Sequence, residues 1–336
     1  MAQNRVRIVD VADSLGLSTA TVSKVIHGKT EKISEETVKR VQQELESSGY
    51  IPNMAGILLA RNNSKIIGVV VNDHVKYEGN VLEDGFVMSS LNALSHEVNE
   101  KGYFLMIKTT SDISEIPVFA SMWNMDGLIL MGFCEADYEK LRNQMRISFV
   151  VYDGYFEKCS KVVNLVINHY DGGYQAGSHL KMIGHKKALC IADNFICMDK
   201  ERIEGFCAAF EPGEILRWQI PKKKKGRMLF YEENFQELLK NSVTAVFAVS
   251  DFYALEFMRF LQGKGIQIPN DIQITGFDDN MASRESNPTL TTIHQEASLR
   301  AKIAIECLEA MRDGAECEKE IVLPVEIIKR ESTGEL

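Results

Sequence analysis

The sequence predicts a small all-α head followed by a larger α/β body of two lobes, each built on a doubly wound parallel sheet. In the first 50 residues, apolar side chains recur at the three-to-four-residue spacing of short helices. From Ile66 onward, apolar strand patterns such as IIGVVV, FLMIKT and AVFAVS alternate with helical stretches, which is typical of parallel sheets. A polar linker, residues 61–65, separates the two patterns.

These patterns predict the domain boundaries. We expect a head over residues 1–52, a short helix and linker over 53–65, and a two-lobed body over 66–336. Lobe 1 is expected to contain about 66–162 and 295–317, and lobe 2 about 163–290 and 320–332. The expected connections between the lobes are Gly154–Val162, Asn280–Gln295 and Cys317–Val322.

The charge balance separates the head from the body. The chain has 336 residues, 45% hydrophobic and 25% charged, with a formal net charge of −9, which is an ordinary globular composition. Residues 1–62 contain eight Lys/Arg against seven Asp/Glu, so the negative charge lies in the remainder. An acidic body argues against nucleic-acid binding along the whole chain, but a near-neutral head can bind phosphates if its cations share one face.

The cysteines and the apolar segments predict a cytoplasmic protein. The seven cysteines are scattered and form no Cys-x-x-Cys pair, so we expect reduced thiols. The first ten residues are polar and charged, unlike a signal peptide. No apolar run approaches the roughly 20 residues that a membrane helix needs.

Residues 8–27 have the pattern of a helix-turn-helix. Gly16 can adopt the left-handed backbone of a tight turn, and Ser18 is a suitable N-cap for the second helix. The predicted core positions share the helical spacing and are Ile8, Val11, Ala12, Leu15, Leu17, Val22, Val25 and Ile26. In such a motif the second helix enters the DNA major groove. An ordinary amphipathic helix pair is the alternative.

The exposed face of the second helix supplies the candidate base contacts, which are Thr19, Ala20, Ser23 and Lys24. Thr19 and Ala20 lie at the N-terminal end, which points at base edges, and both can touch a thymine methyl group. Lys24 can reach guanine or a phosphate.

A third helix between Ser34 and Gly49 completes the head. Its inner stripe is Val38, Val41 and Leu45. The runs VRIVDVADSLGLSTATVSKVIHGK and ISEETVKRVQQELESSGYIPN resemble the DNA-binding head of the lactose-repressor (LacI/GalR) family. Two residues depart from the family pattern: Lys24 stands where Arg is common, and Gly56 where Ala is usual. The resemblance implies a DNA-binding transcriptional regulator.

The segment after the head resembles the family's hinge. Asn53 can cap a short helix, MAGILLA, which contains a glycine and is too short to be stable alone. The resemblance implies that this helix orders on the operator, with Asn53 and Leu59 among the DNA contacts and Leu59 wedged into the minor groove. Alternatively, Leu58 and Leu59 pack on the neighbouring domain.

The body resembles that of the same family, which has the periplasmic-binding-protein fold. The resemblance is carried by GGYQAGSHLKMIGHKK, RIEGF and TAVFAVSDFYALEFMRFLQGKGIQIPNDIQITGFDDN. It is weaker in HVKYEGNVLEDGF and over residues 210–233. The resemblance implies a homodimer with a ligand in the cleft between the lobes, and ligands also bind at the carboxyl ends of parallel strands on topological grounds.

Polar residues near the ends of predicted strands are the candidate ligand contacts, and they are Asn72, Asp153, Arg202, Ser250 and Asp278. Carboxylates accept hydrogen bonds and Arg donates as a fork, so the set suits paired hydroxyls. Asp153, Arg202 and Asp278 match ligand positions of the family. Capping a helix is the alternative role of a strand-end Asp, and we expect Asp251 and Asp279 to cap or brace their helices.

Together these features predict a dimeric repressor that binds a pseudo-palindromic double-stranded operator. A small polar effector, a sugar or sugar derivative, is expected to control its operator affinity, with no cofactor and no metal. An enzyme acting on a sugar and a secreted solute-binding protein are the alternatives. The candidate residues lack a nucleophile, which argues against the enzyme, and the helix-turn-helix argues against the secreted protein. We expect Lys222–Lys225 to be a solvated loop. The sequence does not distinguish an inducer from a corepressor, or a dimer from a tetramer.

Overall fold

The computed structural model describes residues 6–26, 28–51, 64–133, 141, 144–145, 147–154 and 162–334. Two compact units, residues 1–64 and 65–336, make up the chain. None of the described helices combines the length and apolar character that a membrane crossing needs.

The head is a three-helix unit around one small core. Its helices are α1 (Ile8–Leu15), α2 (Thr19–Ile26) and α3 (Glu35–Ser47). Gly16 turns the chain between α1 and α2 with a left-handed φ of +65°, and the Ser18 hydroxyl accepts a hydrogen bond from the backbone N–H of Thr21 at 3.2 Å. The core consists of Val11, Ala12, Val22, Val25 and Val41, and the other predicted core positions pack against it. The predicted helix-turn-helix is confirmed.

Lobe 1 of the body has a six-stranded parallel sheet within the described residues, with strand order β11-β5-β4-β3-β1-β2. The strands are β1 (Ile66–Val71), β2 (Phe104–Thr109), β3 (Gly127–Met131), β4 (Phe149–Tyr152), β5 (Val162–Ile167) and β11 (Glu320–Leu323). The helical segments are η1 (Val75–Tyr77), η2 (Val81–Glu83), α5 (Gly85–Glu100), α6 (Glu115–Met122) and α13 (Ala297–Arg312). Alternate residues of β1 pack on opposite faces, Val69 with the α5 side and Val70 with the α6 side. Because both faces are covered, all six residues of β1 are buried.

Lobe 2 has a four-stranded parallel sheet in the described part of the chain, with strand order β7-β6-β8-β9. The strands are β6 (Lys187–Ala192), β7 (Glu214–Gln219), β8 (Ala245–Ala248) and β9 (Gln273–Thr275), and the helices are α8 (His169–Met182), α9 (Cys197–Phe210), α10 (Lys224–Lys240) and α11 (Asp251–Gly263). Phe206 of α9 stacks on Phe247 at 4.9 Å between ring centroids. Phe257 of α11 contacts Trp218 at 5.9 Å, so the two helices cover opposite faces. The predicted doubly wound parallel lobes are confirmed.

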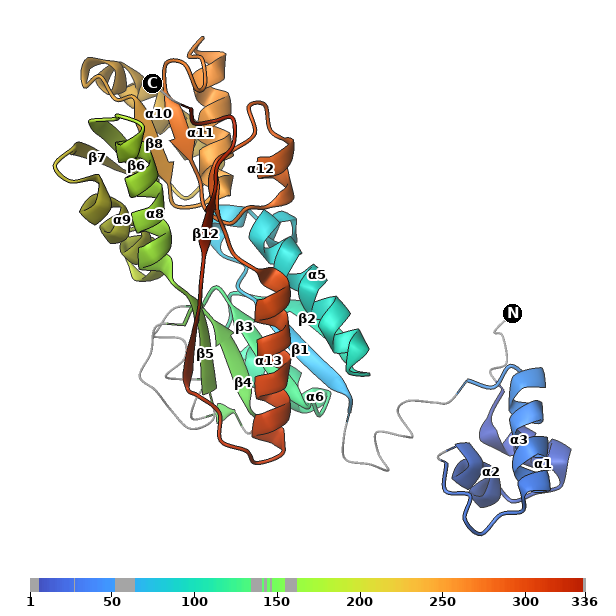
Figure 1. Ribbon diagram of the computed structural model, residues 1–336. Helices are drawn as coiled ribbons and strands as arrows, with labels where there is room; N and C mark the ends of the chain where they lie inside the picture. Colours follow the sequence, from blue (N-terminus) through green and yellow to red (C-terminus); the bar gives the residue numbers. More distant parts are fainter. Residues whose placement is uncertain are drawn as a thin grey trace. The chain divides into compact units, whose positions relative to one another are not determined.

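Three segments connect the lobes. The first runs from β5 into α8, and the other two include β10 (Thr292–His294) and β12 (Glu326–Ile328), which pair antiparallel. Figure 1 shows β12 running between the lobes, with α13 beside the lower sheet and the short α12 (Met281–Glu285) beside the upper one.

Two expected connections differ from the structure. Gly154–Val162 was expected to cross between lobes, with lobe 2 starting at residue 163, but β5 pairs in parallel with β4 inside lobe 1. Cys317–Val322 was expected to be the last connection, but β11 pairs with β5 in the same sheet. The reason is that an apolar run predicts a strand without indicating which sheet it joins. The chain crosses one strand later in each case.

The lysine run is a loop only at Lys222 and Lys223, and helix α10 begins at Lys224. Lys223 is the N-cap of α10, and Lys224 and Lys225 form its first turn. All four side chains from Lys222 to Lys225 are exposed, as expected. Cations at a helix N-terminus oppose the helix dipole, so local charge pattern argued against a helix that begins here. Apolar burial along the rest of α10 offsets this unfavourable charge, since Tyr231 and Leu238 lie in the lobe 2 core.

Glycines allow α8 and α9 to touch backbone to backbone. A Cβ atom at Gly173 of α8 would lie 1.8 Å from the carbonyl oxygen of Arg202, and one at Gly205 of α9 would lie 1.9 Å from that of Tyr170. Real Cβ atoms do not approach so closely, and the obstacle is backbone that cannot rotate away. This contact sets the position of α9, which carries Arg202.

We predict that Gly205→Ala destabilises the body by about 1–3 kcal/mol, because the helices must separate to relieve the overlap. Gly263→Ala at the end of α11 is the matched control, since nothing lies within 4 Å of its added methyl group and alanine favours helix. Urea unfolding measures both free energies. Equal stability of the two variants would contradict the close helix contact.

Candidate functional site

A cavity of about 180 Å³ lies between the lobes at the carboxyl ends of their strands. Its polar lining comes from both lobes and includes Asn72, Lys76, Asp84, Tyr152, Asp153, Asp193, Asp199, Arg202, Ser250, Tyr253 and Asp278. The structure thus brings together the five residues that the sequence predicted as ligand contacts. It also adds residues that the sequence analysis did not name.

A buried chain of hydrogen bonds joins the lobes at the back of this cavity. The Nε–H of Arg202 donates to Nδ1 of His169 at 3.1 Å. Nε2 of His169 lies 2.9 Å from Oδ1 of Asp153, and the Arg300 guanidinium of α13 lies 2.8 Å from the same oxygen. All four side chains are buried. These hydrogen bonds therefore connect α9 in lobe 2, through the first residue of α8, to the end of β4 and to α13 in lobe 1.

The protonation states in this chain follow from its geometry. Burial lowers the pKa of His169 to about 4, so the ring is neutral near pH 7, with Nε2 donating to Asp153 and Nδ1 accepting from Arg202. Burial by itself would raise the pKa of Asp153, but the Arg300 guanidinium and the His169 hydrogen bond outweigh burial and hold that pKa well below its usual value. Asp153 is therefore an ionised acceptor whose partners all donate.

The backbone at the cavity is strained at two of the predicted residues. Asp153 has a φ of +54° and Asp278 a φ of +126°, both in the region that favours glycine. Each such residue costs about 1–3 kcal/mol and persists only where the surroundings hold it. Asp153 is held by its ion pair, and Asp278 by the side chain of Gln295, which donates to Oδ1 at 2.9 Å.

The other predicted residues already have partners inside the protein. The Asn72 amide donates to the carbonyl of Gly132 at 2.8 Å, and the Ser250 hydroxyl caps α11 by accepting from the backbone N–H of Tyr253 at 3.4 Å. Arg202 stacks over the ring of Phe277 at 3.7 Å and donates to the carbonyl of Val249 at 2.5 Å. These contacts fix the positions of the side chains that line the cavity.

Several cavity residues were missed by the sequence analysis. Asp193 directly follows β6 and satisfies the strand-end rule that selected Asp153, so the signal was present. Lys76 of lobe 1 lies within electrostatic range of Asp193 and Asp199 of lobe 2, a pairing that no sequence spacing indicates. Burial raises the pKa of Asp199 to about 6 and raises that of Asp278 well above its usual value.

Two tyrosines that line the cavity have buried hydroxyls with no hydrogen-bond partner among the described residues. They are Tyr152 at the end of β4 and Tyr253 on α11, one from each lobe, and both side chains are almost fully buried. Burial raises the pKa of both phenols, so both hydroxyls stay protonated near pH 7. A buried polar group without a partner costs about 1–3 kcal/mol, which a ligand that supplies the missing bond would recover.

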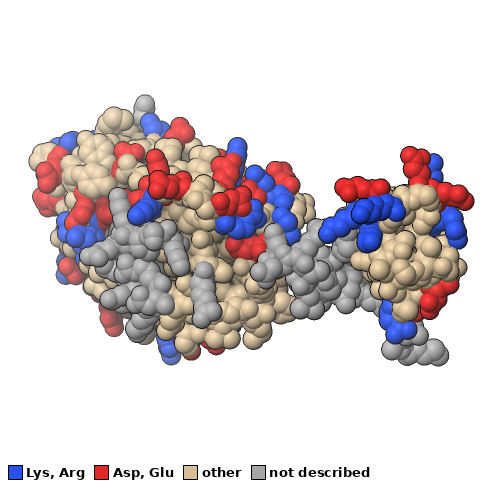
Figure 2. All heavy atoms as spheres, turned by 90° about the horizontal axis from the view of Figure 1, so that it is seen from below, with Lys and Arg blue, Asp and Glu red and all other residues tan. Residues whose placement is uncertain are grey.

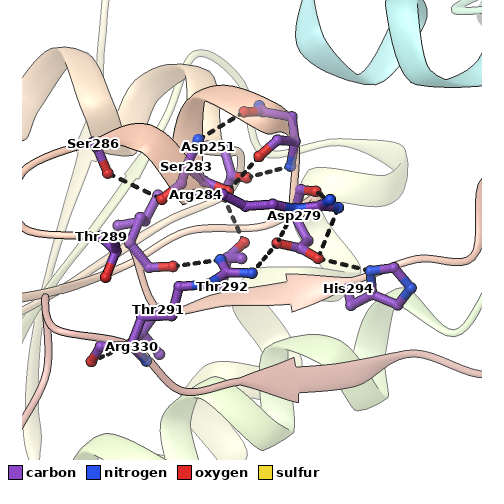
Figure 3. Close-up of polar contacts among 12 residues, drawn as sticks. Asp251, Asp279, Ser283, Arg284, Ser286, Thr289, Thr291, Thr292, His294 and Arg330 are labelled. Atoms are coloured by element: carbon purple, nitrogen blue, oxygen red, sulfur yellow. Dashed lines mark hydrogen bonds and ion pairs between the residues drawn. The ribbon is translucent and has the colours of Figure 1, made fainter.

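A second polar network supports the two C-terminal connections, and Figure 3 shows it. Asp279 accepts from Arg284 of α12 at 3.2 Å and lies 2.9 Å from Nδ1 of His294 on β10. The Arg330 guanidinium beyond β12 pairs with its other oxygen. Asp279 therefore links α12 to both connecting segments.

Asp251 supports the same region and does not cap α11, where Ser250 has that role. Its carboxyl group accepts from the backbone N–H of Asn280 at 3.1 Å and from the Thr292 hydroxyl at 2.5 Å, as drawn in Figure 3. Burial raises the pKa of Asp251 to about 7. Both aspartates brace the connections, as the sequence analysis expected in part.

The head presents the predicted base-contacting face of α2. Thr19, Ala20 and Lys24 are exposed, and Ser23 is half-buried. Asn53 and Leu59, the expected hinge contacts, lie outside the described residues. In the body, Figure 2 shows basic and acidic side chains interspersed over the visible face. Among the residues that the structure describes, no group of three or more His, Cys, Asp or Glu is arranged to hold a metal ion.

Comparison with known proteins gives matches to both units. Residues 7–53 match the family described as bacterial regulatory proteins, lacI family, and residues 178–333 match the periplasmic binding protein-like domain. The HTH-type transcriptional repressor PurR of Actinobacillus pleuropneumoniae is 30% identical over 322 residues, which cover 93% of this chain and 92% of that protein.

Solved structures have the same fold. The lac repressor dimer bound to operator and an anti-inducer superposes with a TM-score of 0.83 at 21% identity, covering 98% of this chain and 99% of that one. A LacI family transcriptional regulator from Enterococcus faecium, with bound ribose, superposes with a TM-score of 0.65 at 25% identity, covering 81% of this chain and 99% of that one. The chain therefore belongs to the lacI family of bacterial regulatory proteins, DNA-binding transcription regulators that join a helix-turn-helix head to a periplasmic-binding-protein-like body.

Proposed function

We propose that this protein is a homodimeric repressor whose operator affinity is controlled by a small polyhydroxylated ligand, a sugar or sugar derivative, bound between the lobes. The observation that carries the proposal is that Tyr152 and Tyr253 line one cavity from opposite lobes and that their hydroxyls have no partner among the described residues. A ligand that bonds to both favours the closed arrangement of the lobes.

The lining supports a ligand rich in hydroxyl groups. Protonated tyrosines donate and accept, while the carboxyl groups of Asp153 and Asp278 offer acceptors. Among the described residues, Ile167, His169 and Arg300 all contact Oδ1 of Asp153, and Oδ2 can accept from a ligand hydroxyl. The ribose in the Enterococcus faecium regulator is consistent with this class of ligand.

We assign ligand contact to Asn72, Asp153, Arg202, Ser250 and Asp278, with Tyr152 and Tyr253 added. Arg202 has a second role, because its Nε–H holds His169 in the tautomer that donates to Asp153. A ligand that touches Arg202 or Asp153 therefore acts on the chain of bonds that joins the lobes.

In this proposal the heads bind DNA only as a pair. One α2 helix contacts about one half-site, so a dimer should bind a pseudo-palindrome with half-sites about one helical turn apart. Lobe closure would set the spacing of the two heads. A ligand shifts this equilibrium by its differential affinity for the two states, typically about 1–3 kcal/mol of coupling.

The tyrosine pair can be tested without knowing the ligand in advance. We predict that Tyr152→Phe and Tyr253→Phe leave the free energy of unfolding unchanged or raise it, because each removes a buried group that has no partner. Each should weaken ligand binding by about two- to tenfold, the usual value of one neutral hydrogen bond. Thermal shift with ribose, xylulose and cellobiose identifies the ligand, and calorimetric titration then measures its affinity.

Tyr231→Phe is the matched control, since the Tyr231 hydroxyl is buried but bonded to Glu256 away from the cavity. It should lower stability slightly and leave ligand affinity unchanged. Variants of Tyr152 and Tyr253 that bind the ligand as tightly as the natural protein would refute their assignment.

The head makes a separate prediction. Lys24→Ala should cost about 1–3 kcal/mol of operator affinity at the base it reads and relax discrimination there. Lys39→Ala, which removes an equally exposed charge from α3, should weaken binding uniformly across sequences. Gel-shift titrations of operators mutated one base pair at a time measure both effects. Identical base profiles for the two variants would show that Lys24 does not read a base.

A further inference from the structure

Two thiols lie together on the α9-facing side of the lobe 2 sheet, away from the cavity. Cys190 is in the centre of β6, and its register partners are Arg217 on β7 and Phe247 on β8. Phe247 stacks on Phe206 of α9, which places the next residue of that helix, Cys207, over the same part of the sheet. The two thiols therefore lie within interaction range of each other.

The two cysteines differ in exposure and in their neighbours. Cys190 is fully buried, whereas Cys207 is half-buried at the edge of the helix. The exposed guanidinium of Arg217 donates to the sulfur of Cys207 at 3.2 Å. A cation beside a partly accessible thiol stabilises the thiolate, which is the reactive form of cysteine.

The neighbouring groups shift the pKa values of the two thiols in opposite directions. The neighbouring Cys190 thiol and the Arg217 guanidinium lower the pKa of Cys207 below its ordinary value, against the effects of burial and of Glu211 at the end of α9. Burial raises the pKa of Cys190 well above its usual value. A nucleophilic thiolate therefore faces a protonated thiol.

We propose that Cys207 is a peroxide-reactive thiolate and Cys190 its resolving partner, an oxidation-responsive site distinct from the ligand cavity. The Cys207 sulfur attacks one oxygen of hydrogen peroxide, the O–O bond breaks, and hydroxide leaves, giving a sulfenic acid. The Cys190 sulfur then attacks that sulfur, the S–O bond breaks, and water leaves with the Cys190 proton. Two thiols are oxidised to one disulfide while the peroxide is reduced to two waters.

The position of the site gives the oxidation a structural consequence. Cys207 lies five residues after Arg202 on α9, and Gly205 between them makes the close contact with α8. A bond from Cys207 to β6 would tie this helix to the sheet. The pair in lobe 1 is a useful contrast, because burial raises the pKa of Cys307, next to Cys317, to about 11.

Alkylation of the folded full-length protein tests the first half of the proposal. The rate of iodoacetamide labelling at each cysteine is measured by mass spectrometry between pH 5 and pH 9. For Cys207 we expect a half-maximal rate at a pH well below that of an ordinary thiol, and Arg217→Gln should move this midpoint upward. Lys187→Gln, which removes a cation paired with Glu214 on the same sheet, should leave it in place. A Cys207 midpoint near the ordinary value of about 8.5 would overturn the proposal.

Oxidation with one equivalent of hydrogen peroxide tests the second half. Peptide mapping should show a Cys190–Cys207 disulfide in the natural protein, and Cys190→Ala should instead give a Cys207 sulfenic acid that dimedone traps. Cys317 is the internal reference and should react more slowly than Cys207 at pH 7. Cys207 that stays reduced while Cys317 is oxidised would contradict the assignment, as would a natural protein that accumulates only sulfenic acid.

Discussion

The body depends on one buried chain of bonds, from Arg202 through His169 to Asp153, which is also paired with Arg300. Removing one member of such a pair leaves an uncompensated buried charge, at a cost of about 3–5 kcal/mol. These hydrogen bonds form only if His169 is neutral and in one tautomer. Burial keeps the ring neutral. The hydrogen bonds also need α9 close to α8, which the glycines at 173 and 205 permit.

This constraint explains why the cavity suits a ligand-operated device. Asp153 and Arg202 both line the cavity and belong to the hydrogen bonds that join the lobes, so a ligand bound there, as proposed, would change the balance between lobe arrangements. The hydroxyls of Tyr152 and Tyr253 have no hydrogen-bond partner within the described part of the chain. The backbone strain at Asp153 and Asp278 also lies at this cavity. The polar network around Asp279 holds the two C-terminal connections together.

The sequence predicted the fold well where a local pattern decides the structure. Gly16, Ser18 and Ser34 mark the helix ends of the head because turns and caps are local events. The strands of the body follow from apolar runs. The sheet that β5 and β11 join is instead decided by pairing with strands distant in sequence, and no local run of residues predicts that pairing.

The site was predicted in part for the same reason. The positions of polar residues at strand ends predicted Asp153 and Asp278. Asp193 also follows a strand and could have been predicted in the same way. His169 was missed because its role depends on β5 leading directly into α8, and Tyr253 because its hydroxyl is distinguished only by lacking a partner. The thiol pair at Cys190 and Cys207 is 17 residues apart in sequence and becomes a pair only when α9 covers β6.

The central claim is that a ligand between the lobes and an operator at the heads are energetically coupled. It is tested most directly by measuring operator affinity with and without a saturating carbohydrate that raises the unfolding temperature, and carbohydrate affinity with and without operator. Linkage requires the two ratios to be equal, and the account predicts a ratio of about 5 to 150 in either direction. A ratio of one in both measurements, with the carbohydrate shown to bind in the cavity, would contradict the account.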